Sequence, residues 1–176
     1  NTTELTYSIF CTAAESGERI GTVHISVEAT TVGSGILLSQ DVDIYEGETA
    51  AETVVRMLQN NGYSVDYTGN YETGFYLARI SSESNFVTGN IPEDLRTKLE
   101  EHGFEIYDFT PNSLGDYDFT KGSGWMYQVN GVYPNYGLSD YCFQNGDTLR
   151  LRFTLAYGAD IGQDMTGGSD NWGYEW

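Results

Sequence analysis

Few side chains of this sequence could act in catalysis, and their spacing does not favour it. Asp116 and Asp118 stand two residues apart, and paired carboxylates are the machinery of glycoside hydrolases. A pair so close in a glycine-containing segment is more typical of a turn, where carboxylates accept main-chain hydrogen bonds. The two histidines, His24 and His102, fall in an expected strand and near the end of an expected helix. A Cys11–His24 nucleophile pair has no local motif beside it, so we expect that this chain is not an enzyme.

Metal chemistry has equally little support. Asp160, Asp164 and Asp170, with glycines at 167–168 between them, could offer oxygen ligands to calcium. Their spacing does not follow an EF-hand loop, and a solvated acidic tail is the simpler interpretation. Zinc would require a denser cluster of histidines and cysteines than this chain has. We expect no metal site.

The segment 122–141 concentrates aromatic rings and predicts binding instead. Trp125, Tyr127 and Val129 alternate along an expected strand and therefore share one of its faces. The pair at 130–131, Asn-Gly, tolerates positive φ angles and is typical of a two-residue hairpin turn. For Trp125 and Tyr127 two interpretations stay open: a ligand surface, or the inward face of the strand.

The loop after this turn carries large rings with polar tips and neither a base nor a nucleophile. Such rings bury much area at low cost in rotamer freedom, which suits a surface that holds a ligand or partner. We therefore expect a ligand-binding surface, whose candidate residues are Trp125, Tyr127, Tyr133, Tyr136, Leu138, Asp140 and Tyr141.

The elements that must position this surface are mostly strands. Alternating polarity predicts strands at 5–11, 22–30 and 74–80, and a last strand whose inward residues are Leu149, Leu151, Phe153 and Leu155. A capping box at Thr49 and Glu52 begins a helix over 49–61 that Asn-Gly ends. Pro92 starts a second, short helix near 92–102, followed by an extended return containing Phe104, Ile106 and Phe109.

These motifs resemble a known family. The blocks Gly122-Ser-Gly-Trp-Met-Tyr-Gln-Val-Asn-Gly131, Gly137-Leu-Ser-Asp-Tyr141 and Asn145-Gly-Asp147 are similar to the transcobalamin-like C-terminal domain, which recurs in surface proteins of Gram-positive bacteria. The resemblance extends upstream through 114–118, 74–80 and the expected helix at 49–61. It implies a β-grasp-like fold and, in the vertebrate relatives, a half-site that closes over cobalamin while a helical domain supplies the other face.

Composition restricts the partners. Twenty-six acidic against eight basic residues give a net charge of −18, which disfavours nucleic acid and anionic membrane surfaces. No apolar run is long enough to span a bilayer, and we expect the export signal to lie outside these residues. This composition is typical of an extracellular or cell-surface bacterial protein. Cys11 and Cys142 could form a disulfide or remain buried thiols.

Together these observations predict an α+β chain with a β-grasp-like mixed sheet on one main helix. We expect an N-terminal lead-in strand at 1–21, one domain at 22–161 with a small helical insertion at about 81–113, and an acidic aromatic tail or linker at 162–176. The expected function is a non-catalytic extracellular binding module, without a cofactor, for a small molecule, glycan or surface protein. The alternatives are a cobalamin-binding half-site and an unrecognised hydrolase.

Overall fold

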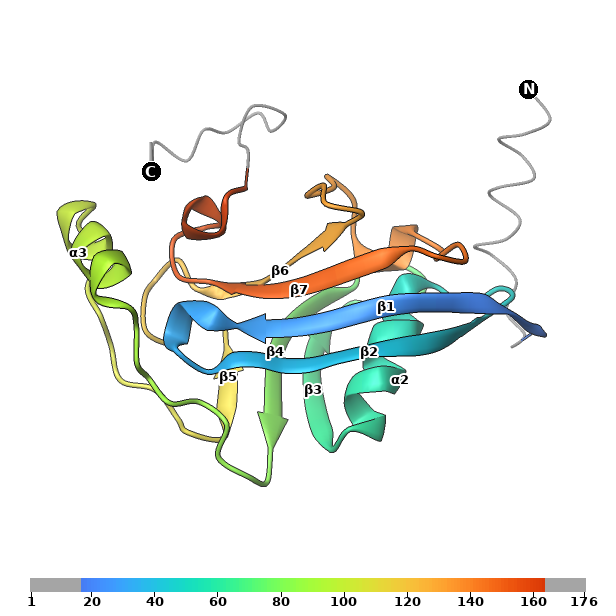
Figure 1. Ribbon diagram of the computed structural model, residues 1–176, viewed down its shortest axis with the longest axis horizontal. Helices are drawn as coiled ribbons and strands as arrows, with labels where there is room; N and C mark the ends of the chain where they lie inside the picture. The colour runs from blue at the N-terminus through green and yellow to red at the C-terminus, as the bar shows by residue number, and fades with distance from the viewer. Residues whose placement is uncertain (1–16, 164–176) are drawn as a thin grey trace.

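The computed structural model describes residues 17–163, which form an α+β structure with two sheets, as Figure 1 shows. The first sheet has the order β2-β1-β7-β6. Its strands are β1 (Arg19–Ala29), β2 (Gly35–Tyr45), β6 (Gly124–Val129) and β7 (Thr148–Thr154). The β1–β2 and β6–β7 pairs are antiparallel, whereas β1 and β7 are parallel. The expected α+β class and mixed sheet are therefore confirmed.

A second, three-stranded sheet has the order β3-β4-β5, and both of its strand pairs are antiparallel. Its strands are β3 (Tyr63–Thr68), β4 (Tyr76–Ser82) and β5 (Ser113–Gly115). Helix α2 (Ala50–Asn60) lies beside β3 beneath the first sheet, and α3 (Glu93–Glu101) stands apart at one end (Figure 1). Three 3-10 turns complete the described chain: η1 (Thr30–Val32), η2 (Leu138–Asp140) and η3 (Ala159–Ile161).

The inward faces of these elements form one core. Alternate residues of β1 and β7 are buried on the side that meets α2 and β4, as the period of two requires. From α2 the core receives Val54, Val55 and Leu58, all of which are almost fully buried. The main contributors from the strands are Val23, Ile25, Val27, Leu77, Ile80, Leu149, Leu151 and Phe153.

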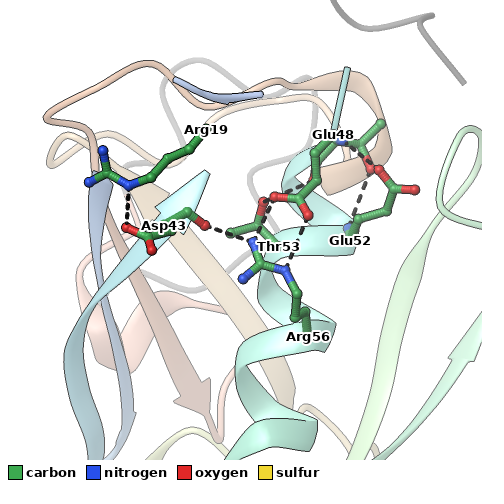
Figure 2. A network of polar contacts seen from close by, with 7 residues as sticks. Arg19, Asp43, Glu48, Glu52, Thr53 and Arg56 are labelled. Carbon is green, nitrogen blue, oxygen red and sulfur yellow. Dashed lines mark hydrogen bonds and ion pairs between the residues drawn. The ribbon is translucent and has the colours of Figure 1, made fainter. Parts of the chain in front are cut away.

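The expected capping box begins α2. The Glu52 amide donates to the Thr49 hydroxyl, and the Glu52 carboxylate accepts from the Thr49 amide at 2.9 Å. Arg56, one turn further on, donates to both carboxylate oxygens of Glu48 and, at 2.7 Å, to the carbonyl of Asp43 in β2 (Figure 2). These contacts fix the start of α2 against the end of β2.

Several boundaries differ from the sequence-based expectation. Strands β3 and β5 were not expected, and the segment with Phe104, Ile106 and Phe109 forms no regular strand, although Phe109 stacks on Phe119 at 4.7 Å. The expected strand at 5–11 and most of the expected tail lie outside the described residues. Cys142 is buried and disulfide-bonded. Cys11, the other cysteine of the chain, lies outside the described residues.

Removing buried side-chain volume from α2 should destabilise the fold. Leu58 has none of its surface exposed, so Leu58→Ala should lower the free energy of unfolding by about 2–5 kcal/mol. Chemical denaturation measures this change. The matched control is Gln59→Ala on the exposed side of the same helix, and a similar loss in both variants would contradict the assigned core face.

Candidate ligand-binding cavity

A cavity of about 500 Å³ opens between β6, the beginning of β4 and the loop 133–138. This volume falls within the range of roughly 300–1,000 Å³ that is usual for small-molecule sites. Phe75, Tyr76 and Leu77 line one side, and residues 122–127 line the other. The described lining residues include hydroxyls and one amide, but no histidine, cysteine, lysine, arginine, aspartate or glutamate. Its composition is that of a hydrogen-bonding, largely aromatic recess.

Five of the seven candidate residues meet in this cavity: Trp125, Tyr127, Tyr133, Tyr136 and Leu138. Asp140 and Tyr141 do not line it, although both hold the loop in place. Ligand binding by these residues stays a prediction.

Trp125 and Tyr127 belong to the inward face of β6 and also border the cavity. Trp125 is only 6% exposed, and its indole nitrogen donates to the Leu114 carbonyl at 2.9 Å. The Tyr127 hydroxyl donates to the carbonyl of Tyr136, which joins β6 to the loop that covers it. Burial raises the pKa of Tyr127, which extends the pH range over which its hydroxyl remains a donor. Both residues therefore belong to the inward face of β6, and their part in a ligand surface stays a prediction.

Tyr133 ties the other end of the loop to η3. Its hydroxyl donates to the Ile161 carbonyl at 2.6 Å and accepts from Arg152 at 3.1 Å. Arg152 also donates to the same carbonyl at 2.8 Å. Because both ends of the loop are fixed by hydrogen bonds to other segments, the cavity is largely preformed.

The two remaining candidates act behind the lining. The Asp140 carboxylate accepts from the Gly137 amide at 3.3 Å and so stabilises the short turn η2. The Tyr141 ring stacks on Tyr136 at 5.5 Å, and its hydroxyl donates to Asp147 at 2.7 Å. Asp147 also accepts from the Asn130 amide group at 3.0 Å, which connects the hairpin turn to the loop. Asp147 is not among the seven candidate residues, although it ends the Asn-Gly-Asp motif of the sequence.

Asp116 and Asp118, the pair considered for hydrolysis, have separate partners. Asp118 accepts from Arg79 at 2.7 Å and from the Gly115 amide at 2.9 Å, as expected for a turn carboxylate. Asp116 instead accepts from the Tyr76 hydroxyl at the cavity wall, at 2.9 and 3.0 Å. Burial, more than any neighbouring charge, raises the pKa of Asp116.

The other reactive side chains are engaged elsewhere. Both ring nitrogens of His24 are hydrogen-bonded, to Asp41 at 2.8 Å and Ser39 at 3.0 Å, on the outer face of the first sheet. His102 is the C-terminal cap residue of α3, as expected. Asp160 accepts from the Thr154 hydroxyl and, at 2.7 Å, from the Leu155 amide. Among residues 17–163 no cluster of three or more potential metal ligands occurs, and Asp164 and Asp170 lie outside that range.

The cavity residues that sequence reasoning missed come from distant segments. Phe75, Tyr76 and Leu77 lie in the strand expected at 74–80 and are not among the candidate site residues, but they line the cavity. Gln163 lies in the tail expected at 162–176, but it also lines the cavity. No local spacing marks these residues, because the tertiary arrangement of β4 and β6 brings them together.

Comparison with known proteins gives limited matches. Residues 104–154, which include β5, β6, β7 and the loop 133–138, match the family described as "Domain of unknown function (DUF4430)". No curated protein matches the chain. A solved structure titled "Crystal Structure of Haptocorrin in Complex with Cbi" is similar at 13% sequence identity and a TM-score of 0.43. The match covers 77% of this chain and 25% of the haptocorrin chain, so this chain spans about a quarter of that protein. No helix of the described residues is long and apolar enough to cross a bilayer.

Removing the Tyr127 hydroxyl should loosen the loop. Tyr127→Phe leaves the Tyr136 carbonyl without this donor and should lower the free energy of unfolding by about 1 kcal/mol. Denaturant titration measures the loss, and amide exchange should accelerate across 133–138. The control is Tyr117→Phe, whose ring is 74% exposed. Equal effects of the two substitutions would show that the loop does not depend on this contact.

The pKa of Tyr76 should depend on the negative charge of Asp116. Burial, and then the hydrogen bond to Asp116 and its negative charge, raise the pKa of Tyr76 to about 12. Because the folded-state pKa exceeds the value of about 10 in an unfolded chain, Tyr76 should contribute stability that is lost as the pH rises from about 10 to about 12. In Asp116→Asn the pKa should fall but stay above the ordinary value, because burial remains. NMR titration of the Tyr76 ring resonances measures both values, and an unchanged pKa would contradict the assigned coupling.

Proposed function

We propose that this protein is a non-catalytic extracellular binding module whose cavity between β6, β4 and the loop 133–138 receives a ligand. The observation that carries this proposal is the preformed recess of about 500 Å³, lined by aromatic rings with hydroxyl groups. The aromatic rings offer contact area to a ligand, and the hydroxyl groups can fix its orientation by hydrogen bonds.

The lining also argues for binding rather than turnover. Its described polar side chains are hydroxyls, one amide and the Trp125 indole, and none of them is a base or an activated nucleophile. Asp116, the carboxylate next to the cavity, accepts a hydrogen bond from Tyr76, and Asp118 is paired with Arg79. The hydrolase alternative would therefore have to use a carboxylate that already serves the structure.

An extracellular location is part of the proposal. Cys142 is disulfide-bonded, and disulfides persist in oxidising compartments outside the cytosol. The net charge of −18 fits a protein that stays dispersed and avoids polyanions. We further propose that the module belongs to a secreted or cell-surface protein.

A corrinoid is a second candidate ligand. The sequence blocks around Trp125 and Tyr136 resemble the transcobalamin-like domain, and the stacked Tyr136 and Tyr141 rings offer a flat surface to a flat macrocycle. Tyr136 is 37% exposed and can be reached from solvent. A sugar could stack on the same ring, so the two ligand classes have to be separated by experiment.

Tryptophan fluorescence should detect ligand entry. Trp125 is the tryptophan that lines the cavity among residues 17–163, and the chain's other two tryptophans are Trp172 and Trp176. Replacing both in Trp172→Phe with Trp176→Phe isolates the Trp125 signal. Titration with cobinamide, cobalamin, oligosaccharides and blocked peptides, corrected for absorption by the corrinoids, should give saturation for at least one class. Binding of that class should weaken by at least about 10-fold in Tyr136→Ala, which removes a lining ring.

The matched control for this titration is Tyr107→Ala. Tyr107 is also partly exposed, at 44%, but does not line the cavity. Equal weakening in the two variants would contradict a cavity site, and a lack of saturation with every class would contradict the binding function. Hydrolysis of an oligosaccharide or peptide that Asp116→Asn abolishes would replace the proposal with the enzyme alternative.

A further inference from the structure

Strand β6 has a free edge, and its residues 124–127 line the cavity. In an antiparallel pair, successive residues direct their main-chain groups alternately toward the partner strand and away from it. The Asn130 amide donates to the Thr148 carbonyl of β7 at 2.8 Å. Val129 instead exchanges two hydrogen bonds with Val132 on the opposite side, at 2.9 and 3.0 Å. Even-numbered residues of β6 therefore face β7, and odd-numbered residues face the free edge.

Trp125 and Tyr127 consequently point their amide and carbonyl groups away from β7. Among residues 17–163, no main-chain hydrogen bond outside the strand ladders involves either residue. Strand β6 ends its sheet, and β4, across the cavity, belongs to the other sheet. Four main-chain groups thus lie on a strand edge inside a recess, with the spacing that an added strand requires.

Pro134 explains why the chain does not cover this edge itself. The Val129–Val132 bridge begins an antiparallel hairpin, and continuing its register would bring residue 134 opposite Tyr127. Proline has no amide hydrogen, so it cannot donate to the Tyr127 carbonyl. After this single bridge the chain leaves β6, and the loop 133–138 contributes to the cavity lining instead of pairing with the edge.

The surroundings indicate the chemistry of an added strand. A strand beside β6 would run between Trp125 and Tyr127 on one side and the 75–77 segment on the other. At the start of β6, Gly124 lies so close to Asp116 that a β-carbon there would be 2.9 Å from the carboxylate. A carboxylate next to the open edge, in a chain of net charge −18, favours a cationic side chain on the incoming strand.

We propose that the cavity binds an extended peptide, which adds as a strand to β6 through Trp125 and Tyr127 and places a lysine or arginine beside Asp116. This inference rests on the proposed binding function and names its ligand class. None of the lining residues within 17–163 is charged, which fits a site that recognises main chain, with apolar or hydroxylated side chains in the recess. The other edge of the first sheet, β2, carries Asp41 and Asp43, whose charges protect an edge from pairing.

A library of acetylated and amidated hexapeptides tests the proposal. Valine and threonine alternate in each peptide, and one lysine occupies each position in turn. Saturable binding by Trp125 fluorescence should identify a preferred lysine position. On binding, hydrogen exchange followed by NMR should slow at the Trp125 and Tyr127 amides, whereas Met126 and Gln128, which already face β7, should change little.

Two further experiments distinguish main-chain pairing with β6 from binding by side-chain contacts alone. N-methylation of peptide residues whose amides face β6 should weaken binding by about 10-fold or more, and methylation of the alternate residues should not. Asp116→Asn should weaken binding of the lysine peptide by about 2- to 10-fold, but not of its norleucine analogue. Asp108→Asn, at an exposed aspartate outside the cavity lining, is the control and should leave both affinities unchanged.

The outcomes distinguish this inference from the proposed function. Saturation by cobinamide or an oligosaccharide, with no binding by any library member, would overturn strand addition and leave the binding function intact. Peptide binding that is insensitive to N-methylation and leaves the Trp125 and Tyr127 amides unprotected would also overturn it. If no probe saturates, both proposals fail.

Discussion

The parallel pairing of β1 with β7 is the constraint on which the rest of the structure depends. It joins the first described strand to the last, from His24 opposite Thr148 to Glu28 opposite Arg152. Beside this ladder, the buried Glu28 carboxylate accepts from Arg150 at 2.7 and 2.8 Å, and that hydrogen-bonded ion pair lowers the pKa of Glu28. Thr31, just after β1, donates to the Phe153 carbonyl at 2.7 Å. Because β7 is fixed in this way, β6 can pair with it and form one wall of the cavity.

The cavity is held open by polar contacts behind its lining. Asp147 accepts hydrogen bonds from Asn130, Tyr141 and the Gln144 amide, so one carboxylate connects the hairpin turn, the aromatic loop and the approach to β7. Tyr127 and Tyr133 then fix the two ends of the loop. A recess that is organised before its ligand arrives avoids part of the entropy cost of ordering side chains on binding.

Signals confined to neighbouring residues were readable from the sequence. The capping box at Thr49 and Glu52, the alternation along β7 and the Asn-Gly turn all appear where the pattern placed them. Strand β3 was missed because its residues are mostly exposed and lack a strong apolar face, and β5 because three residues are too few to show a period.

The candidate site also contains residues that the sequence identifies and residues that only the tertiary structure brings to it. Its loop residues were identifiable because aromatic rings are concentrated in one segment. Phe75, Tyr76 and Leu77 were not, because their position follows from the pairing of β4 with β5 and from the approach of β6. The role of Asp116 as the partner of Tyr76 also depends on two segments that are 40 residues apart.

The long-range pairing of β1 with β7 has a kinetic consequence. The contacts that fasten these strands, Glu28 with Arg150 and Thr31 with Phe153, each span 122 residues of sequence. The chain loses conformational entropy when so long a loop closes, before the contacts that offset this loss have formed. Proteins dominated by such long-range pairings therefore fold slowly. During synthesis, β1 and β2 therefore emerge from the ribosome long before β7 exists to complete their sheet. The cavity, which depends on β6 and β7, can form only when nearly the whole described chain has been made.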